Sequence, residues 1–167
     1  NPPLTPDPEW YHRAVLTGDP SYSGITTIFC MQWLRAQLER VGYSDIDTIY
    51  NSPFASRMFS SGNLGGTMFA YRGYLGVSGF NTGYIDGLSN GGELSFAVIP
   101  TCGSGSFASS THTYSEAFLR NANGGAIGAI GTATLGTHTR YNNTYFSGVC
   151  EGVINTGDRH LGAAHTR

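Results

Sequence analysis

Cys102 is the residue of this chain whose chemistry and setting are most informative. It ends an apolar run that extends from Phe96 to Thr101, and the glycine-rich segment 103–106 follows it directly. The run predicts a strand, and a strand that leads into a glycine-rich turn presents its end at the rim of a sheet, where α/β proteins bind ligands. A thiol at that rim is a candidate nucleophile, whereas the alternative is an inert buried cysteine.

A cysteine nucleophile needs a neighbouring base or a lowered pKa, together with backbone N–H groups that hold the developing oxyanion. His138 and His112 are the candidate bases, because an imidazole titrates near neutral pH and both residues follow predicted strands. The alternative for each is an ordinary polar loop residue. Gly73 and Gly103 are the candidate oxyanion donors, since glycine lets the peptide backbone of a substrate come close.

Three charged residues near the predicted strand ends are candidates for binding a substrate. Arg72 and Arg140 carry forked guanidinium groups that suit a carboxylate, although a buried structural ion pair explains them equally well. Asp19 stands at the end of the first predicted strand, where its carboxylate would suit a basic side chain. The alternative for Asp19 is a turn residue that precedes Pro20.

The elements that must position these residues follow from the hydrophobic pattern. Apolar residues recur every three to five positions over residues 26–41 and predict a helix. Short apolar runs without clean alternation predict buried strands over residues 13–16, 46–50, 67–71, 94–101 and 126–132, and further helices are expected over 114–121 and 141–154. This order favours a three-layer α/β domain with a mostly parallel sheet flanked by helices, which brings the candidate residues to one edge.

Composition restricts the classes of partner. The 167 residues fit a single domain, with residues 1–8 as a proline-rich extended lead-in that is not a signal peptide. Only 12% of residues are charged, the net charge is −2 and lysine is absent from the sequence, so the basic surface that binds nucleic acid or an anionic membrane is lacking. No apolar stretch approaches the roughly 20 residues that span a bilayer. We expect a peptide or protein partner, leave the oligomeric state open, and expect the chain to be part of a longer protein.

Other motifs of enzymes and metal sites do not compete with this interpretation. The sequence has no Gly-x-Ser-x-Gly elbow, no phosphate-binding glycine loop and no His-Glu-x-x-His helix. Cys30, Cys102 and Cys150 match no zinc pattern and no disulfide framework, so at least one thiol is free if the chain acts alone.

Four segments resemble the gingipain family of cysteine peptidases in their order and spacing. They are Tyr71–Tyr74, Thr101–Cys102, Ser115–Leu119 and Asn123–Thr132. In that family one strand ends in Tyr-x-Gly-His-Gly and supplies the catalytic histidine, and the next ends in Thr-Cys or a near equivalent and supplies the nucleophile. Cys102 matches the nucleophile, whereas Tyr74 stands at the position of the histidine and Leu75 replaces the glycine after it.

The resemblance extends from about residue 7 to residue 154. It implies a caspase-like fold for residues 1–167, a peptide or protein substrate, and a secreted or cell-surface bacterial protein. No cofactor is expected from the residues, and structural calcium is implied by the resemblance alone. Asp45, Asp47 and Asp86 do not form a recognisable calcium loop.

The leading interpretation is a cysteine endopeptidase that hydrolyses peptide bonds through the Cys102 thiolate and an acyl-enzyme, with His138 or His112 as the proton carrier. A phenol such as Tyr74 is a poor base at neutral pH. The alternative is therefore a degenerate, non-hydrolytic gingipain-like domain that binds peptides or serves as a structural module in an exported protein. The same nucleophile would also suit another acyl transfer, such as a transferase or sortase-like reaction.

Overall fold

The structure is a computed structural model that describes residues 8–108, 111–156, 160 and 162. Five parallel strands form one sheet in the order β2-β1-β3-β4-β5. The chain adds β2 on one side of β1 and the later strands on the other, so the strand order reverses between β1 and β3. Where the order reverses, a crevice forms at the carboxyl ends of the strands, and α/β proteins bind ligands there. The strands are β1 (Arg13–Gly18), β2 (Asp45–Ile49), β3 (Met68–Arg72), β4 (Ser95–Val98) and β5 (Ala126–Ile130).

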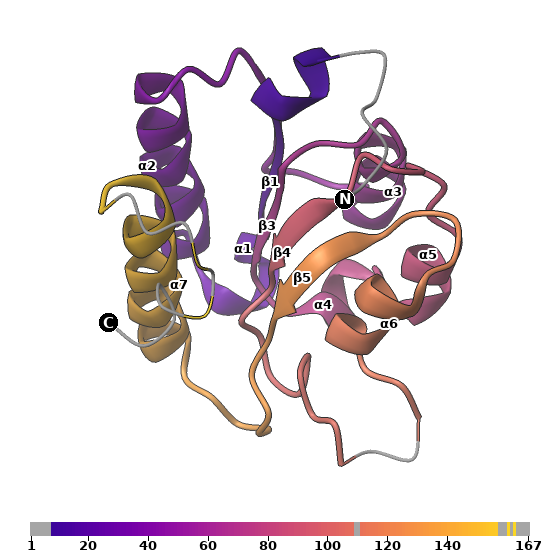
Figure 1. Cartoon of the computed structure of the whole chain (residues 1–167). Coiled ribbons are helices and arrows are strands. Elements are labelled where there is room, and N and C mark those ends of the chain that lie inside the picture. The colour runs from indigo at the N-terminus through magenta and orange to yellow at the C-terminus, as the bar shows by residue number, and fades with distance from the viewer. Residues whose placement is uncertain (1–7, 109–110, 157–159, 161, 163–167) are drawn as a thin grey trace.

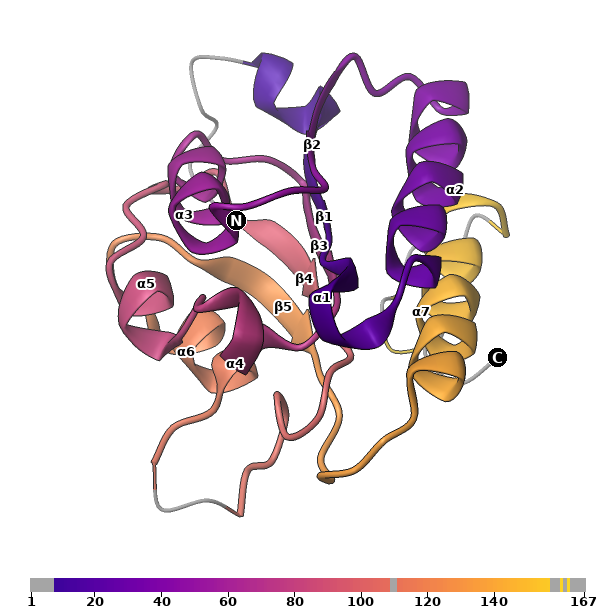
Figure 2. The same ribbon diagram turned by 180° about the vertical axis from the view of Figure 1, so that it is seen from behind.

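Helices cover both faces of the sheet (Figure 1). The long helices α2 (Thr26–Arg40) and α7 (Thr139–Ile154) pack together on one face. The other face carries α3 (Phe54–Asn63), α5 (Thr82–Asp86) and α6 (Tyr114–Arg120). Two short helices, α1 (Pro20–Ser23) and α4 (Leu75–Ser78), follow β1 and β3 at the carboxyl edge of the sheet (Figure 2), and a 3-10 turn (Pro8–His12) precedes β1.

The sheet is buried on both faces. In β3, Met68 and Ala70 belong to the core beneath α2 and α7, whereas Phe69 and Tyr71 belong to the core on the opposite face. All four side chains are buried. Two covered faces explain why the strand sequences show no clean alternation of apolar and polar residues.

The α/β class and the three-layer arrangement predicted from the sequence are confirmed. Each predicted strand is present, with shifts at its ends. The largest shift is in β4, which ends at Val98 because the Pro100 nitrogen carries no hydrogen and cannot continue the ladder. Helix α7 begins at Thr139, earlier than expected, because His138 caps it.

Helices α3 and α5 were not predicted. The last turn of α3 contains Ser60, Ser61 and Gly62, which have weak intrinsic helix propensity. Its stability comes from tertiary packing instead, since Phe54 and Met58 are buried against the sheet. Packing of one apolar face stabilises short helices more than propensity does.

Candidate active site

A cleft of about 550 Å³ opens at the carboxyl edge of the sheet. Segments that follow β1, β3, β4 and β5 contribute to it, and Figure 1 shows the long loops after β4 and β5 extending from this edge. The convergence of strand ends expected from the sequence is therefore present. The residues that line the cleft are Tyr22, Ser23, Gly73, Tyr74, Thr101, Cys102, Leu135, Gly136, Thr137, His138, Thr139 and Asn142.

Cys102 is partly exposed in this cleft. Its Sγ lies 3.2 Å from Thr137 Oγ1 and 3.6 Å from the Thr137 carbonyl oxygen. Burial raises the pKa of the Cys102 thiol, but hydrogen bonds from the Thr137 side chain and from backbone groups of Thr137 and Gly136 outweigh it, and the net pKa is lowered. Burial raises the pKa of the other two thiols, Cys30 and Cys150. Cys102 is thus the thiol best suited to ionise, which a nucleophile requires.

Two backbone hydrogen bonds hold the loop after β4 against the loop after β5. The Gly103 N–H donates to the Thr134 carbonyl at 3.0 Å, and the Gly105 N–H donates to the Thr132 carbonyl at 2.9 Å. Gly103 adopts a φ of 71°, and a Cβ at this position would lie 2.9 Å from the Leu135 side chain. Because its N–H is already engaged, Gly103 is not available as an oxyanion donor in this conformation.

Gly73 lines the cleft on the β3 side. Its φ is 153°, and a Cβ would lie 2.5 Å from the Tyr71 hydroxyl, so a larger residue would be strained and crowded. The Thr101 hydroxyl donates to the Gly73 carbonyl at 3.0 Å. The Gly73 N–H makes no backbone hydrogen bond within the described residues. Of the two candidate oxyanion donors, Gly73 is the one whose N–H stays free of a backbone acceptor.

His138 lines the same cleft as Cys102. It is also the N-cap of α7, because its Nδ1 accepts a hydrogen bond from the Arg140 N–H at 3.2 Å. A neutral imidazole that accepts at Nδ1 carries its proton on Nε2. To take a proton from a thiol, the His138 ring must therefore first release the Arg140 N–H.

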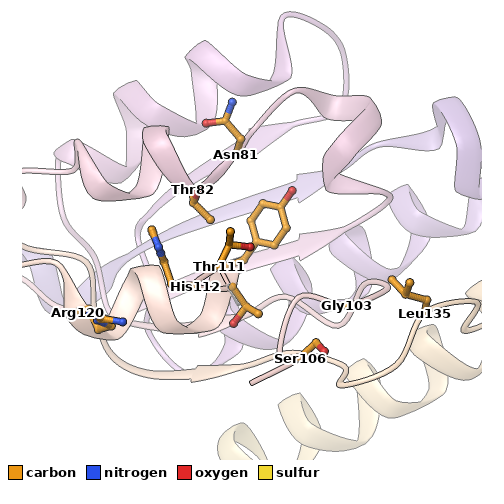
Figure 3. Close-up of a pocket in the computed structure, with 10 residues that line it drawn as sticks. Asn81, Thr82, Gly103, Ser106, Thr111, His112, Arg120 and Leu135 are labelled. Atoms are coloured by element: carbon orange, nitrogen blue, oxygen red, sulfur yellow. The ribbon is translucent and has the colours of Figure 1, made fainter. Parts of the chain in front are cut away.

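His112 lies in a second hollow of about 890 Å³ (Figure 3). Its Nε2 is 3.0 Å from Asp86 Oδ2, so the imidazole has a carboxylate partner on α5. Leu135 lines both hollows and lies at the boundary between them, whereas Gly103 lines only the hollow of His112. In Figure 3, His112 stands across the hollow from Leu135. The structure therefore places His138, but not His112, among the residues that line the cleft of the candidate nucleophile.

Tyr74 contributes one wall of the cleft. Its side chain is 38% exposed, and its ring centroid lies 5.5 Å from that of Tyr22. The two phenols come from segments after β3 and β1, the strands between which the order of the sheet reverses. They present aromatic surface and hydroxyl groups to whatever occupies the cleft.

Arg72 is completely buried, which corrects the prediction that it binds substrate. Its guanidinium donates to Asn143 Oδ1 at 2.8 Å, to the Thr139 carbonyl at 3.4 Å and to the Pro100 carbonyl. The alternative of a buried ion pair is also corrected, since no described carboxylate pairs with it. Burial lowers the pKa of Arg72 to about 10. The side chain stays charged at neutral pH and joins the ends of β3 and β4 to the start of α7.

The other two candidates for substrate binding lie outside the cleft. Asp19 is 1% exposed, and its carboxylate accepts hydrogen bonds from the Ser21 N–H at 2.9 Å and the Ser78 hydroxyl at 2.5 Å. It is thus a buried cap of α1 and not a pocket for a basic side chain. Arg140 is exposed, lies over the Tyr141 ring and donates to its hydroxyl at 2.9 Å.

Two residues of the site were not predicted from the sequence. Thr137 contacts the Cys102 sulfur, and Asn142 Nδ2 donates to Thr137 Oγ1 at 2.9 Å. Asn142 is buried in the first turns of α7, where it also lines the cleft. The only signal in the sequence is that Thr137 precedes His138 and Asn142 follows it within about one helical turn, which does not distinguish them from their neighbours.

The residues present do not fit the structural calcium that the resemblance implies. A calcium ion needs about six to eight oxygen ligands. Asp45 instead pairs with Arg13 at 2.8 Å, Asp47 accepts a hydrogen bond from Ser61, and Asp86 pairs with a histidine. Within the described residues, no three His, Cys, Asp or Glu side chains are grouped closely enough to hold a metal ion.

Comparison with known families settles where the chain belongs. The sequence profile of peptidase family C25 matches residues 4–167. The chain belongs to peptidase family C25. A comparison with curated protein sequences found no match. In that part of the chain that the structure describes, no helix is both long and apolar enough to cross a membrane.

Two solved structures share the fold of this C25 domain. One is the Arg-specific cysteine proteinase gingipain R, with 20% sequence identity and a TM-score of 0.78, and the match covers 89% of this chain and 38% of that chain. The other is the complex of the RgpB pro- and mature domains from Porphyromonas gingivalis, with 20% identity, a TM-score of 0.77 and coverage of 88% and 38%. The chain therefore spans about 38% of the length of these structures. The gingipain-like family and the caspase-like fold predicted from the sequence are confirmed, and the domain is of the cysteine peptidase type.

Proposed function

We propose that this domain hydrolyses peptide bonds with the Cys102 thiol as the nucleophile. The observation that carries the proposal is the setting of the sulfur, which is partly exposed in a cleft and receives hydrogen bonds that lower the pKa of the thiol. Family membership supports a peptide or protein as the substrate. The first step is attack of the thiolate on the carbonyl carbon of the scissile bond, which forms a C–S bond and an oxyanion.

Gly73 and His138 assist this step. Gly73 lines the cleft, and its N–H, which has no backbone acceptor among the described residues, donates to the oxyanion. His138 releases the Arg140 N–H and takes the proton of the thiol on Nδ1. The imidazolium then gives that proton to the leaving amine as the C–N bond breaks, which leaves a thioester on Cys102.

Hydrolysis of the thioester completes the cycle. A water molecule attacks the thioester carbonyl while His138 takes its proton. The C–S bond then breaks, the new carboxyl group leaves, and the proton returns to the sulfur. None of these steps requires a metal or another cofactor.

A bound peptide would extend beyond Cys102 into the hollow that contains His112. The two hollows are adjacent, because Leu135 lines both and Gly103, which lines the hollow of His112, follows Cys102 directly in the chain. Arg120 also lines the hollow of His112, and it brings a positive charge. Figure 3 shows Arg120 on the same side of this hollow as His112 and opposite Leu135. A peptide with an acidic residue near the scissile bond therefore suits this surface.

A second candidate function is a non-hydrolytic domain that binds peptides in the same cleft. Tyr74 favours it, because by resemblance this residue stands where the family has its catalytic histidine. The engagement of the His138 Nδ1 with Arg140 favours it as well. In this case the cleft would hold a peptide without breaking it.

Assay of a peptide library against the native chain and against Cys102→Ala separates the two functions. We expect the native chain to cleave a subset of peptides and Cys102→Ala to bind the same subset without cleavage. Binding without cleavage by both proteins would overturn the hydrolytic proposal in favour of the second. Cleavage that survives in Cys102→Ala would exclude Cys102 as the nucleophile.

The likeness to a bacterial gingipain also supports an exported location, either secreted or on the cell surface. Detection of the full-length protein in the medium or on intact cells would support this. Confinement to the cytoplasm would contradict it.

A further inference from the structure

A chain of two hydrogen bonds ends at the sulfur of the candidate nucleophile. Asn142 Nδ2 donates to Thr137 Oγ1 at 2.9 Å, and Thr137 Oγ1 lies 3.2 Å from Cys102 Sγ. The three side chains come from the loop after β4, the loop after β5 and the first turns of α7. All three line the cleft in which we propose that the peptide binds.

The donor at Asn142 leaves the hydroxyl proton of Thr137 available for the second bond. Its amide N–H occupies an acceptor position of Thr137 Oγ1, and the hydroxyl has a single proton to donate. With the amide at one lone pair, the hydroxyl can donate that proton to an ionised sulfur, which can only accept a hydrogen bond. The neutral thiol has its own acceptor, the Thr137 carbonyl oxygen at 3.6 Å. Both protonation states of Cys102 therefore have a partner on the same residue, but only the hydroxyl bond strengthens when the sulfur becomes negative.

Burial and neighbouring contacts keep this arrangement in place. Asn142 is 6% exposed, and its N–H makes the first helical bond of α7, to the His138 carbonyl at 3.2 Å. Arg72 donates to the Thr139 carbonyl and to Asn143, so the start of α7 is fixed to the sheet at both sides of Asn142. The amide therefore has little freedom to leave Thr137.

We propose that Thr137 is a catalytic residue that stabilises the Cys102 thiolate through its hydroxyl, and that Asn142 is a positioning residue that holds this hydroxyl toward the sulfur. The proposal rests on the proposed function only in taking Cys102 as the nucleophile. It assigns to a threonine and an asparagine the stabilisation of the thiolate, which in cysteine nucleophiles is commonly provided by a cation or a helix N-terminus.

Alkylation of Cys102 by iodoacetamide as a function of pH tests this proposal, with the modified cysteine located by peptide mass spectrometry. We expect Thr137→Val, which keeps the shape but lacks the hydroxyl, to raise the midpoint of the rate profile by about one pH unit and to slow alkylation near neutral pH about tenfold. Thr137→Ser restores the hydroxyl and should restore the midpoint. Asn142→Leu should shift the midpoint in the same direction as Thr137→Val, by a smaller amount.

Other titratable groups around the sulfur are unchanged in these variants. They are Tyr22, Tyr74 and His138 in the cleft and the charged Arg72 beneath it. Differences between the variants therefore report the hydroxyl. Cys150 is fully buried, so its resistance to the reagent in the same sample verifies that each variant is folded.

Equal midpoints for the native chain and a folded Thr137→Val would overturn the proposal. So would a Thr137→Ser profile that matches Thr137→Val, because a variant that keeps the hydroxyl would then behave like one that lacks it. Since alkylation needs no peptide hydrolysis, a shift in a chain that cleaves nothing would support this inference while the proposed function fails.

Discussion

The His138 imidazole accepts a hydrogen bond from the Arg140 N–H at 3.2 Å, so the residue that is best placed to carry a proton for Cys102 also caps α7. The two roles exclude each other at Nδ1, since a protonated ring has no lone pair for the helix. Each proton transfer must therefore uncap α7. In the proposed mechanism, the side chain of this residue therefore serves stability in one state and chemistry in the other.

Substitutions at His138 can separate these roles. His138→Asn keeps a side-chain oxygen that caps a helix, whereas His138→Ala removes the cap and should cost about 1 kcal/mol of stability. If His138 carries the proton, the Asn variant unfolds like the native chain in urea but cleaves peptides at least 100-fold more slowly, in the usual range for general acid–base catalysis. An Asn variant with native cleavage rates would show that another group moves the proton.

Tyr74→His tests the position that the family resemblance assigns to its histidine. An imidazole on the wall of the Cys102 cleft would supply a base with a pKa near neutral, and we expect kcat/KM for peptide cleavage to increase at least tenfold. Tyr74→Phe is the matched control and should leave kcat/KM near the native value, because we assign the phenol no part in proton transfer. An unchanged kcat/KM in a folded Tyr74→His would mean that an imidazole at this position does not reach the scissile bond.

The capping box of α6 offers a stability test away from the nucleophile. The Thr113 N–H donates to Glu116 Oε2 at 2.8 Å, which is one half of the box. Thr113→Ala should lower the free energy of unfolding by about 1 kcal/mol in urea titrations. Thr144→Ala, the same change at an exposed site inside α7, should have a smaller effect. An equal effect of the two substitutions would contradict a capping role.

The same box predicts a dependence on pH. The hydrogen bond from the Thr113 N–H holds the pKa of Glu116 below its ordinary value. The native state therefore releases this proton more readily than the unfolded state, so the stabilisation is complete above the ordinary pKa and is lost as the pH falls through the lowered one. Glu116→Gln removes the titration, and the stability difference between it and the native chain should shrink as the pH is lowered. A difference that stays constant with pH would contradict this reasoning.

The strands could be predicted from the sequence because the sheet is covered on both faces. Short apolar runs such as Phe96–Val98 have no other place in a domain of this size than between two layers of helices. Two short helices of one face, α3 and α5, could not be predicted from the sequence, since they depend on packing against the sheet rather than on propensity, whereas α6 on the same face was predicted.

The site residues could be predicted only where the order of strands and loops along the chain determines their position. Gly73, Cys102 and His138 lie in the segments that follow β3, β4 and β5, and the carboxyl ends of parallel strands meet at one edge. The direction in which a side chain points could not be predicted in this way. Arg72 ends a strand but points into the core, and the contact between Thr137 and Cys102 depends on how two loops fold against each other.

The hollow next to the Cys102 cleft predicts a preference for acidic peptides. Arg120→Glu reverses a charge on its wall and should weaken binding of peptides with Asp or Glu by roughly twofold to fivefold, as expected for an exposed ion pair. Arg40→Glu, at the far end of α2, makes the same change in net charge and should leave binding unchanged. Measurements by fluorescence polarisation on Cys102→Ala avoid cleavage of the peptides. Equal loss of affinity in both charge variants would show a general electrostatic effect instead of a local one.

The most direct test of the central claim is detection of the acyl-enzyme. The native chain is mixed with a peptide that it binds, quenched with acid after a short interval and analysed by intact mass spectrometry. The account predicts a covalent adduct with the mass of the N-terminal peptide fragment, located at Cys102 and absent from Cys102→Ala. Recovery of intact peptide with an unmodified chain, under conditions in which binding is saturated, would contradict it.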